Sequence, residues 1–407
     1  MPSDDDRTVY RGARPSPVRR PFRRGHIDAS MMPLGPEVFA AVSEAAPVLH
    51  TSAQSFVGIT EDGVPRPDLF GLRDEGLSTA VIAGAARAWL DCLDADHRRK
   101  AVLSVEAVEW QHWINAFLTF PEHGVLLDEL GADRRGLAMD LVRATVSAAG
   151  MDDIRTAMRL NARLGELCAG YEDTLKEYMY WLTIFGEPSE TEPWGWQLMG
   201  HHLDLNCLIV GGQVVLTPSF LGTEFDGHEL FAEHIKAAVR FMDALNGAQR
   251  DRAVAYRSIR NADLPPHLAG PINGRHVAGA GQDNLVLPYE GLSGDSLDRE
   301  QRTLLHNLIR PYLRVLPDGS RLARQAEIDR HLDVTHVLWM GGWGDGEPFY
   351  YRVHSPIILI EYDNHSGVFL DNPEPQPYHV HTIVRTPNGN DYGKNLLARH
   401  YATAHHR

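Results

Sequence analysis

The sequence predicts an α+β fold, in which an N-terminal helical layer packs on a mixed, mainly antiparallel sheet built from central and C-terminal strands. Apolar residues return at three- and four-residue spacing from about 75 to 185, which is typical of helices. Strand-like runs fill 194–217 and 335–384, far apart in the chain. Because such a sheet is assembled from distant segments, we expect one interlocked α+β domain over 31–407.

The remaining elements follow from local signals. Apolar residues at Ala85, Trp89 and Leu93 mark a helix in the first layer. Gly211-Gly212 separates two apolar runs, which predicts a hairpin with strands over 196–210 and 213–216. Downstream, the sequence predicts helices over 229–258 and 297–330, strands over 335–340, 349–362, 368–371 and 378–384, a turn over 363–367, and a helix over 391–401.

Residues 1–30 contain seven arginines with interspersed prolines, and we expect them to form a disordered or surface arm. No apolar stretch of signal-peptide length follows the arginines, and no window has 18 apolar residues. The three cysteines, Cys92, Cys168 and Cys207, include no CxxC pair. These features predict a cytoplasmic protein with reduced thiols and no membrane partner.

The composition excludes several partners. With 39 basic and 54 acidic residues the formal net charge is −15, which does not suit nucleic-acid binding. No GxGxxG or GxxxxGKS/T motif is present, so no nucleotide cofactor bound by the standard loops is expected. The sequence also lacks GxSxG and HExxH, and it does not indicate an oligomeric state.

Histidine is more frequent than a chain of this length usually has, with 21 in the chain, and the histidines that matter for a site fall on predicted strands. His379 and His381 are two positions apart, so both point to the same face of a strand. Imidazole is a ligand for zinc, copper, iron and nickel. Any one histidine alone is more simply explained as a core or surface residue, but a cluster favours a shared metal site.

Polar residues on the first predicted strand extend this pattern. His202, Asp204 and Asn206 would share one face of the strand, and His201 would lie on the other. Buried polar groups must be hydrogen-bonded or ligating. We therefore predict His202 as a metal ligand, with His201, Asp204 and Asn206 orienting the ligands from outside the coordination sphere.

The strand over 349–362 contributes His354 as a fourth predicted ligand and Glu361 as a ligand or general base. A carboxylate after the run Ile357-Ile-Leu-Ile360 is costly without a cation or donors nearby. Pro356 suggests a bulge or an edge that would change the parity and bring His354 and Glu361 together.

Two further features would complete a substrate pocket. Arg385 precedes an Asn-Gly turn and a helix start, where it could bind an anionic group; a salt bridge to Glu361 or Asp363 is the alternative. Indoles in Gly/Pro-rich contexts could line the cavity, or they could be core residues. The four candidates are Trp194, Trp196, Trp339 and Trp343.

Three blocks of the sequence resemble the domain of unknown function 3500 family. They are Pro193-Trp-Gly-Trp-Gln-Leu-Met-Gly-His-His-Leu-Asp-Leu-Asn206, Tyr351-Arg-Val-His-Ser-Pro356 leading to Glu361-Tyr-Asp-Asn-His365, and His379-Val-His-Thr-Ile-Val-Arg-Thr-Pro-Asn-Gly-Asn-Asp-Tyr-Gly393. The resemblance runs from about Gly58 to about Tyr401 and leaves out the arginine-rich arm. It implies no activity, because the family is functionally uncharacterised.

Together these features predict a metal-dependent enzyme that acts on a small, anionic molecule through one transition metal. Iron or copper activating dioxygen is favoured slightly over hydrolysis at a zinc-bound water, in which Glu361 would take the proton. The other alternative is a non-catalytic small-ligand-binding protein with a tryptophan-lined cleft.

Overall fold

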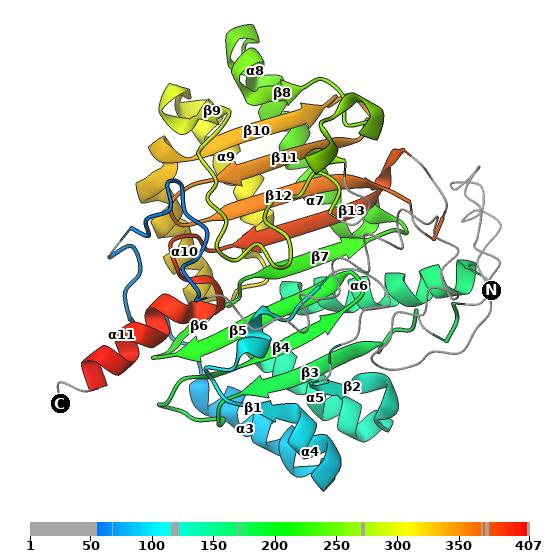
Figure 1. The fold of residues 1–407 in the computed structure, drawn as a ribbon, viewed down its shortest axis with the longest axis vertical. Helices are drawn as coiled ribbons and strands as arrows, with labels where there is room; N and C mark the ends of the chain where they lie inside the picture. The colour runs from blue at the N-terminus through cyan, green and yellow to red at the C-terminus, as the bar shows by residue number, and fades with distance from the viewer. Residues whose placement is uncertain are drawn as a thin grey trace.

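The computed structural model describes residues 55–404 apart from 67, 115–120, 122, 169, 170, 174, 270–272, 368 and 371–373. The predicted arm at 1–30 lies outside the described residues. Within them the predicted α+β class is confirmed (Figure 1).

The described helices fall in two groups along the chain. Four of them form the predicted N-terminal layer: α3 (Thr79–Asp91), α4 (Ala95–Ala101), α5 (Ala132–Thr145) and α6 (Ala148–Leu167). Capping residues explain several starts, since Asp94 and Ser147 accept hydrogen bonds from the first-turn amides of α4 and α6. The later helices are α7 (Gly227–Ala244), α8 (Gly247–Ala253), α9 (Arg299–Ile309), α10 (Asp318–His331) and α11 (Lys394–Ala404).

A single mixed sheet of thirteen described strands runs through the protein. Its main path has the order β1-β3-β4-β5-β7-β13-β12-β11-β10-β8, with β2, β6 and β9 beside β3, β5 and β10. All pairs are antiparallel except β1 with β3 and β8 with β10. The strands are β1 (Val102–Leu103), β2 (Val125–Leu126), β3 (Tyr180–Phe185), β4 (Trp194–Gly200), β5 (Leu203–Val210), β6 (Gln213–Val215), β7 (Ser219–Thr223), β8 (Val254–Tyr256), β9 (Leu292–Ser293), β10 (His336–Gly341), β11 (Phe349–His354), β12 (Leu359–Ser366) and β13 (Pro375–Arg385).

One face of the sheet is apolar and is covered by helices. Trp196 packs in the cluster formed with α3, α5 and α6, and its indole donates to Thr145 on α5. Farther along the sheet Tyr351 and Tyr362 stack on each other and contact Tyr312 and Phe231 of the helical layer. In Figure 1 the helices α6, α7 and α9 lie behind the strands.

The opposite face carries polar side chains and is covered by loops. Asp363 and His381 are register partners on β12 and β13, and Glu361 follows on the same side of β12. Backbone amides in a loop, unlike those within a helix, are not already paired with backbone carbonyls. The amides of Val277 and Ala278 donate hydrogen bonds to Glu361. Buried polar groups on this face are therefore satisfied by irregular chain.

The first predicted strand is wrong in one respect that matters for the site. The chain reverses at His201-His202, so the predicted strand over 196–210 is two antiparallel strands, β4 and β5. His202 has a φ of 63°, in the left-handed region that suits such a two-residue turn. Both histidines therefore lie at a hairpin tip, and strand parity does not govern their orientation.

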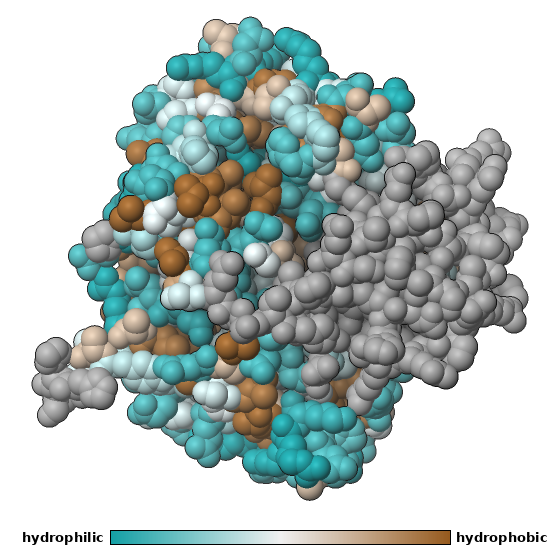
Figure 2. Space-filling model, viewed as in Figure 1, coloured by the Kyte–Doolittle hydropathy of each residue, from teal (hydrophilic) through white to brown (hydrophobic). Residues whose placement is uncertain are grey.

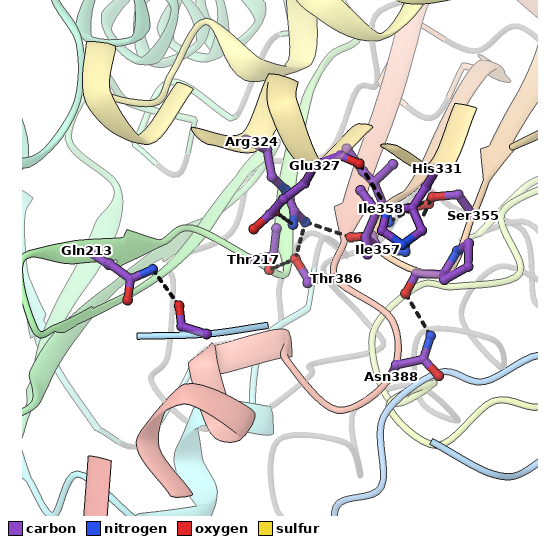
Figure 3. Close-up of polar contacts among 12 residues, drawn as sticks. Gln213, Thr217, Arg324, Glu327, His331, Ser355, Ile357, Ile358, Thr386 and Asn388 are labelled. Carbon is purple, nitrogen blue, oxygen red and sulfur yellow. Dashed lines mark hydrogen bonds and ion pairs between the residues drawn. The ribbon is translucent and has the colours of Figure 1, made fainter. Parts of the chain in front are cut away.

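The predicted strand over 349–362 is likewise two strands, β11 and β12, joined by a turn at Ser355–Ile358. Arg324 of α10 donates to the Ile357 carbonyl (2.7 Å) and to the Thr386 hydroxyl (3.0 Å), and Asn388 donates to the Pro356 carbonyl (2.7 Å) (Figure 3). These contacts attach the turn to the segment after β13. The predicted turn over 363–367 is wrong, because β12 continues to Ser366. The predicted strand over 368–371 lies partly outside the described residues, and its described residues, Phe369 and Leu370, are in a bend.

The described surface is mainly hydrophilic in the view of Figure 2, with separate apolar patches. Val64 and Val286 are among the exposed apolar side chains, at 66% and 52% exposure. None of the helices in the described part of the chain combines the length and hydrophobicity that crossing a bilayer requires.

Candidate metal centre

Three histidines bring their ring nitrogens together on the polar face. The Nε2 atom of His381 lies 3.0 Å from that of His202 and 2.9 Å from that of His379. In the described part of the chain this is the one group of three or more His, Cys, Asp or Glu residues whose ligand atoms all lie within 4.8 Å of one another. All three are buried. The group could hold a metal ion.

The strand register explains how distant residues meet here. Gly222 of β7 pairs with His381 on one side, and its amide donates to the His202 carbonyl (2.8 Å) on the other. A Cβ at position 222 would lie 3.0 Å from the His381 ring and 3.1 Å from the His202 ring. The missing side chain leaves the space in which the two imidazoles meet.

The hydrogen-bonding capacity of the three imidazole rings explains why a cation suits this arrangement. Nε2 of His381 has either one proton or one in-plane lone pair, yet it faces two neighbouring ring nitrogens at once. Burial lowers the pKa of all three imidazoles, and the neighbouring histidines lower it further, so each is neutral at physiological pH. Neutral imidazoles can direct three lone pairs at one ion.

Further histidines flank this group. His201 stacks on His202 with ring centroids 3.8 Å apart, and its Nδ1 lies 2.8 Å from the Asn161 side-chain oxygen. His365 and His276 have ring centroids 4.7 Å and 6.3 Å from that of His381. His201 thus lies directly beside the group, and its orienting role stays a prediction. His365 and His276 were not predicted; only the position of His365 on the polar side of β12 could have indicated it.

Glu361 was predicted to be a ligand or general base, but it contacts other groups. Its oxygens accept from the amides of Val277 and Ala278 (both 2.9 Å) and from the Tyr350 hydroxyl (2.6 Å). Burial raises the pKa of Glu361, but contact with His276, the charge of Arg352 and the Tyr350 hydroxyl outweigh this and lower it to about 2. Such a carboxylate is a weak base.

A second acid of β12 holds the same loop. Asp363 forms a buried two-pronged ion pair with Arg275, in which Nη2 donates to Oδ2 at 2.8 Å. Arg275 also donates to the carbonyls of Ile259 and Asn364. Asp363 and Glu361 together fasten residues 275–278 against the sheet beside the histidines.

Asp204 and Asn206 were predicted to support the ligands, and the structure gives the two side chains different surroundings. Asn206 accepts from Gln197 (2.8 Å) and donates to the Pro218 carbonyl (2.9 Å), a structural network between strands. Neither carboxyl oxygen of Asp204 has a hydrogen-bond partner among the described residues. Burial raises the pKa of Asp204 well above its usual range, and the Gly200 amide offsets this only in part.

His354 lies outside the histidine group, which corrects the predicted set of four ligands. The turn after β11 pairs His354 with Leu359. The His354 side chain therefore lies on the same face of the sheet as Glu361, but toward the end of β12 away from His381. Its ring packs against Tyr289 with centroids 4.6 Å apart. Pro356 does alter the strand, but through a chain reversal rather than a bulge.

Arg385 does not present a free guanidinium to a substrate. It is fully buried and donates to Asp391 (2.7 Å), Asp283 (2.5 Å) and the carbonyl of Ala278 (3.1 Å). The salt-bridge alternative is correct in kind, although the partners are Asp283 and Asp391 rather than Glu361 or Asp363.

The tryptophans predicted to line a pocket belong to the hydrophobic core on the helix-covered face. Trp194, Trp196 and Trp339 are fully buried, and each indole donates to a protein oxygen. Trp343 packs partly buried beside Trp339 and under Arg250. Their burial against helices removes the physical basis for a tryptophan-lined cleft.

A small cavity lies away from the histidines. It has a volume of ≈ 70 Å³, and its lining includes Arg324, Thr217 and Thr386, three of the residues in Figure 3. This volume accommodates water rather than a drug-sized ligand, which needs several hundred cubic ångströms. No histidine lines it.

The fold and the site define an α+β protein with a buried cluster of three histidines that could hold a metal ion. The chain belongs to the family described as "Protein of unknown function (DUF3500)", which matches residues 75–394. All three clustered histidines lie within the matched region. No curated protein and no solved structure matched the chain.

Proposed function

We propose that this protein is a metalloenzyme in which His202, His379 and His381 hold one iron or copper ion and the substrate is a small molecule oxidised by dioxygen. The observation that carries the proposal is the convergence of three neutral, buried Nε2 atoms. A bound redox metal would supply dioxygen activation.

The chain itself provides three conditions for such chemistry. Its ligands are uncharged and soft enough for iron or copper. Aromatic rings surround the group, with Phe220 at 5.1 Å from the His381 ring and Phe369 at 5.4 Å from the His201 ring, and they limit access of water. Burial of the three ligands keeps the site in a low-dielectric environment.

Zinc-dependent hydrolysis is the second candidate, because three histidine ligands also suit catalytic zinc. That reaction needs a group that takes a proton from bound water. Glu361 accepts three hydrogen bonds and has a pKa of about 2, which argues against that role. We therefore favour oxidation.

Metal analysis of full-length protein purified without a histidine tag tests the proposal. We expect close to one equivalent of iron or copper per chain, as purified or after anaerobic reconstitution. Less than about a tenth of an equivalent of any transition metal after reconstitution would overturn it. Stoichiometric zinc that iron and copper do not displace would favour the hydrolase instead.

A double variant, His379→Ala with His381→Ala, identifies the site. Since the variant keeps the other histidines of the chain, metal that it retains is bound elsewhere. The metal lost relative to the unaltered protein therefore measures occupancy of the cluster.

A further inference from the structure

We infer that His276 is a fourth histidine ligand of this metal centre and that Glu361 is the residue that positions it. This inference rests on the proposed metal site. It adds a ligand from a loop, whereas the sequence pattern considered only histidines on predicted strands. The other ligands come from the β4–β5 hairpin tip and from β13.

His276 is a buried imidazole with no hydrogen-bond partner on either ring nitrogen among the described residues. A neutral imidazole has one donor and one acceptor, and each one left unmade in the interior costs about 1–3 kcal/mol. A cation on one nitrogen and a carboxylate beside the other would satisfy both. Because Glu361 lies beside Nδ1, the unpartnered Nε2 atom is the one that points to a ligand.

The carboxylate is already in place. The Nδ1 atom of His276 lies 3.6 Å from Oε2 of Glu361, just beyond hydrogen-bond distance. The Val277 and Ala278 amides and the Tyr350 hydroxyl hold Glu361 in position. A carboxylate beside Nδ1 keeps the proton on that atom and leaves the Nε2 lone pair for a metal, as in metal sites whose histidines donate to carboxylates.

The position of the ring suits a shared ion. Its centroid lies 6.3 Å from that of His381, and the two ring planes are within 19° of parallel. With metal–nitrogen bonds of about 2.1 Å, two imidazoles on one ion have ring centroids roughly 5–6.5 Å apart. His276 does not belong to the group whose ring nitrogens lie within 4.8 Å of one another, so its ring would have to move toward the cluster to bind the same ion.

The loop that carries His276 is fixed on both sides. Arg275 pairs with Asp363, and Gly274 has a φ of 54° and approaches the Asp363 carboxylate so closely that a Cβ there would lie 2.4 Å from Oδ2. Only glycine allows this approach. The backbone beside His276 is thus held against the sheet.

The test uses full-length protein loaded with one equivalent of Cu²⁺, with pulsed EPR to count coordinated imidazoles and competition titration to measure the copper Kd. His276→Ala should lose one imidazole and bind copper at least about tenfold more weakly. Glu361→Gln should keep the count and weaken binding by about tenfold. His306→Ala is the matched control, since that histidine is on α9 and pairs with Asp329.

The possible results separate the two proposals. If the unaltered protein binds copper through three imidazoles, or if His276→Ala keeps the original count and Kd, the assignment of His276 is overturned and the metal site stands. If the unaltered protein binds no copper at the cluster, the metal site itself fails. His276→Gln, which keeps the side-chain volume, replaces the alanine variant if that variant does not fold.

Discussion

The Nε2 atoms of His202 and His381 lie 3.0 Å apart although 179 positions separate the two residues in the sequence, and Gly222 lies between their backbones. The absence of a side chain at position 222 is thus a structural requirement of the cluster. Neither histidine could approach the other over a larger residue.

Gly222→Ala should therefore weaken metal binding. The added methyl group would lie 2.8 Å from the Val380 carbonyl oxygen and about as close to both rings, so the imidazoles must separate. We expect at least a tenfold rise in the metal Kd and a loss of about 1–3 kcal/mol in unfolding free energy, as for other overpacked sites. Isothermal titration and urea unfolding measure these quantities.

Gly136→Ala is the control for that variant, because a Cβ at position 136 of α5 meets nothing within 4 Å. It should leave the metal Kd unchanged. Unaltered binding in Gly222→Ala would show that the two rings do not depend on this space.

Single replacement of either β13 histidine should abolish tight binding. His379→Ala and His381→Ala each remove one of three ligands, and we expect a rise of at least about 100-fold in the metal Kd. His354→Ala should have no such effect, because its ring packs on Tyr289 outside the cluster. Equal losses in all three variants would mean that His354 does belong to the site.

The ion pair between Arg275 and Asp363 should contribute more to stability than a surface pair. Both side chains are buried, so Asp363→Asn leaves an uncompensated guanidinium and should cost about 3–5 kcal/mol in urea unfolding. Asp251→Asn, whose partner Arg257 is 86% exposed, should cost less than about 0.5 kcal/mol. Similar values for the two variants would contradict this view of the loop.

Stability should fall steeply below neutral pH. Burial lowers the pKa of His201, His234 and His354 to about 3, so these groups stay neutral in the folded state. Between their ordinary pKa of about 6.5 and that value, the unfolded chain binds more protons. Above about pH 6.5 these histidines therefore cost no stability. As the pH falls below that value, each one lowers the free energy of unfolding by about 1.4 kcal/mol per pH unit.

The variant His234→Phe tests the origin of this slope. His234 packs against Tyr312 and Phe231 away from the metal ligands, so a phenyl ring suits its surroundings. Urea unfolding of metal-free protein between pH 7.5 and 5 should show about one proton fewer taken up on unfolding. A slope equal to that of the unaltered protein would contradict the expectation.

Three of the four predicted metal ligands come together. Strand periodicity explains the position of two of them, and a chain reversal explains the third. The placement of His379 and His381 on one face follows from the period-two geometry of a strand and is visible in the sequence. His202 also joins the group, but not for the expected reason, because it lies at a hairpin tip within what the sequence presents as one apolar run. His354 is excluded by a chain reversal at Pro356, where the sequence signal fits either a bulge or a turn.

The sequence by itself determined the α+β class, the main strand-forming segments, the family and the strand that carries two ligands, because these depend on periodicity and local motifs. Only the tertiary structure decided that Gly222 makes room for the rings, that His276 and His365 flank them, and that Glu361 and Arg385 form internal contacts. A buried polar side chain is defined by the donors and acceptors around it, and here those come from residues many positions away in the chain.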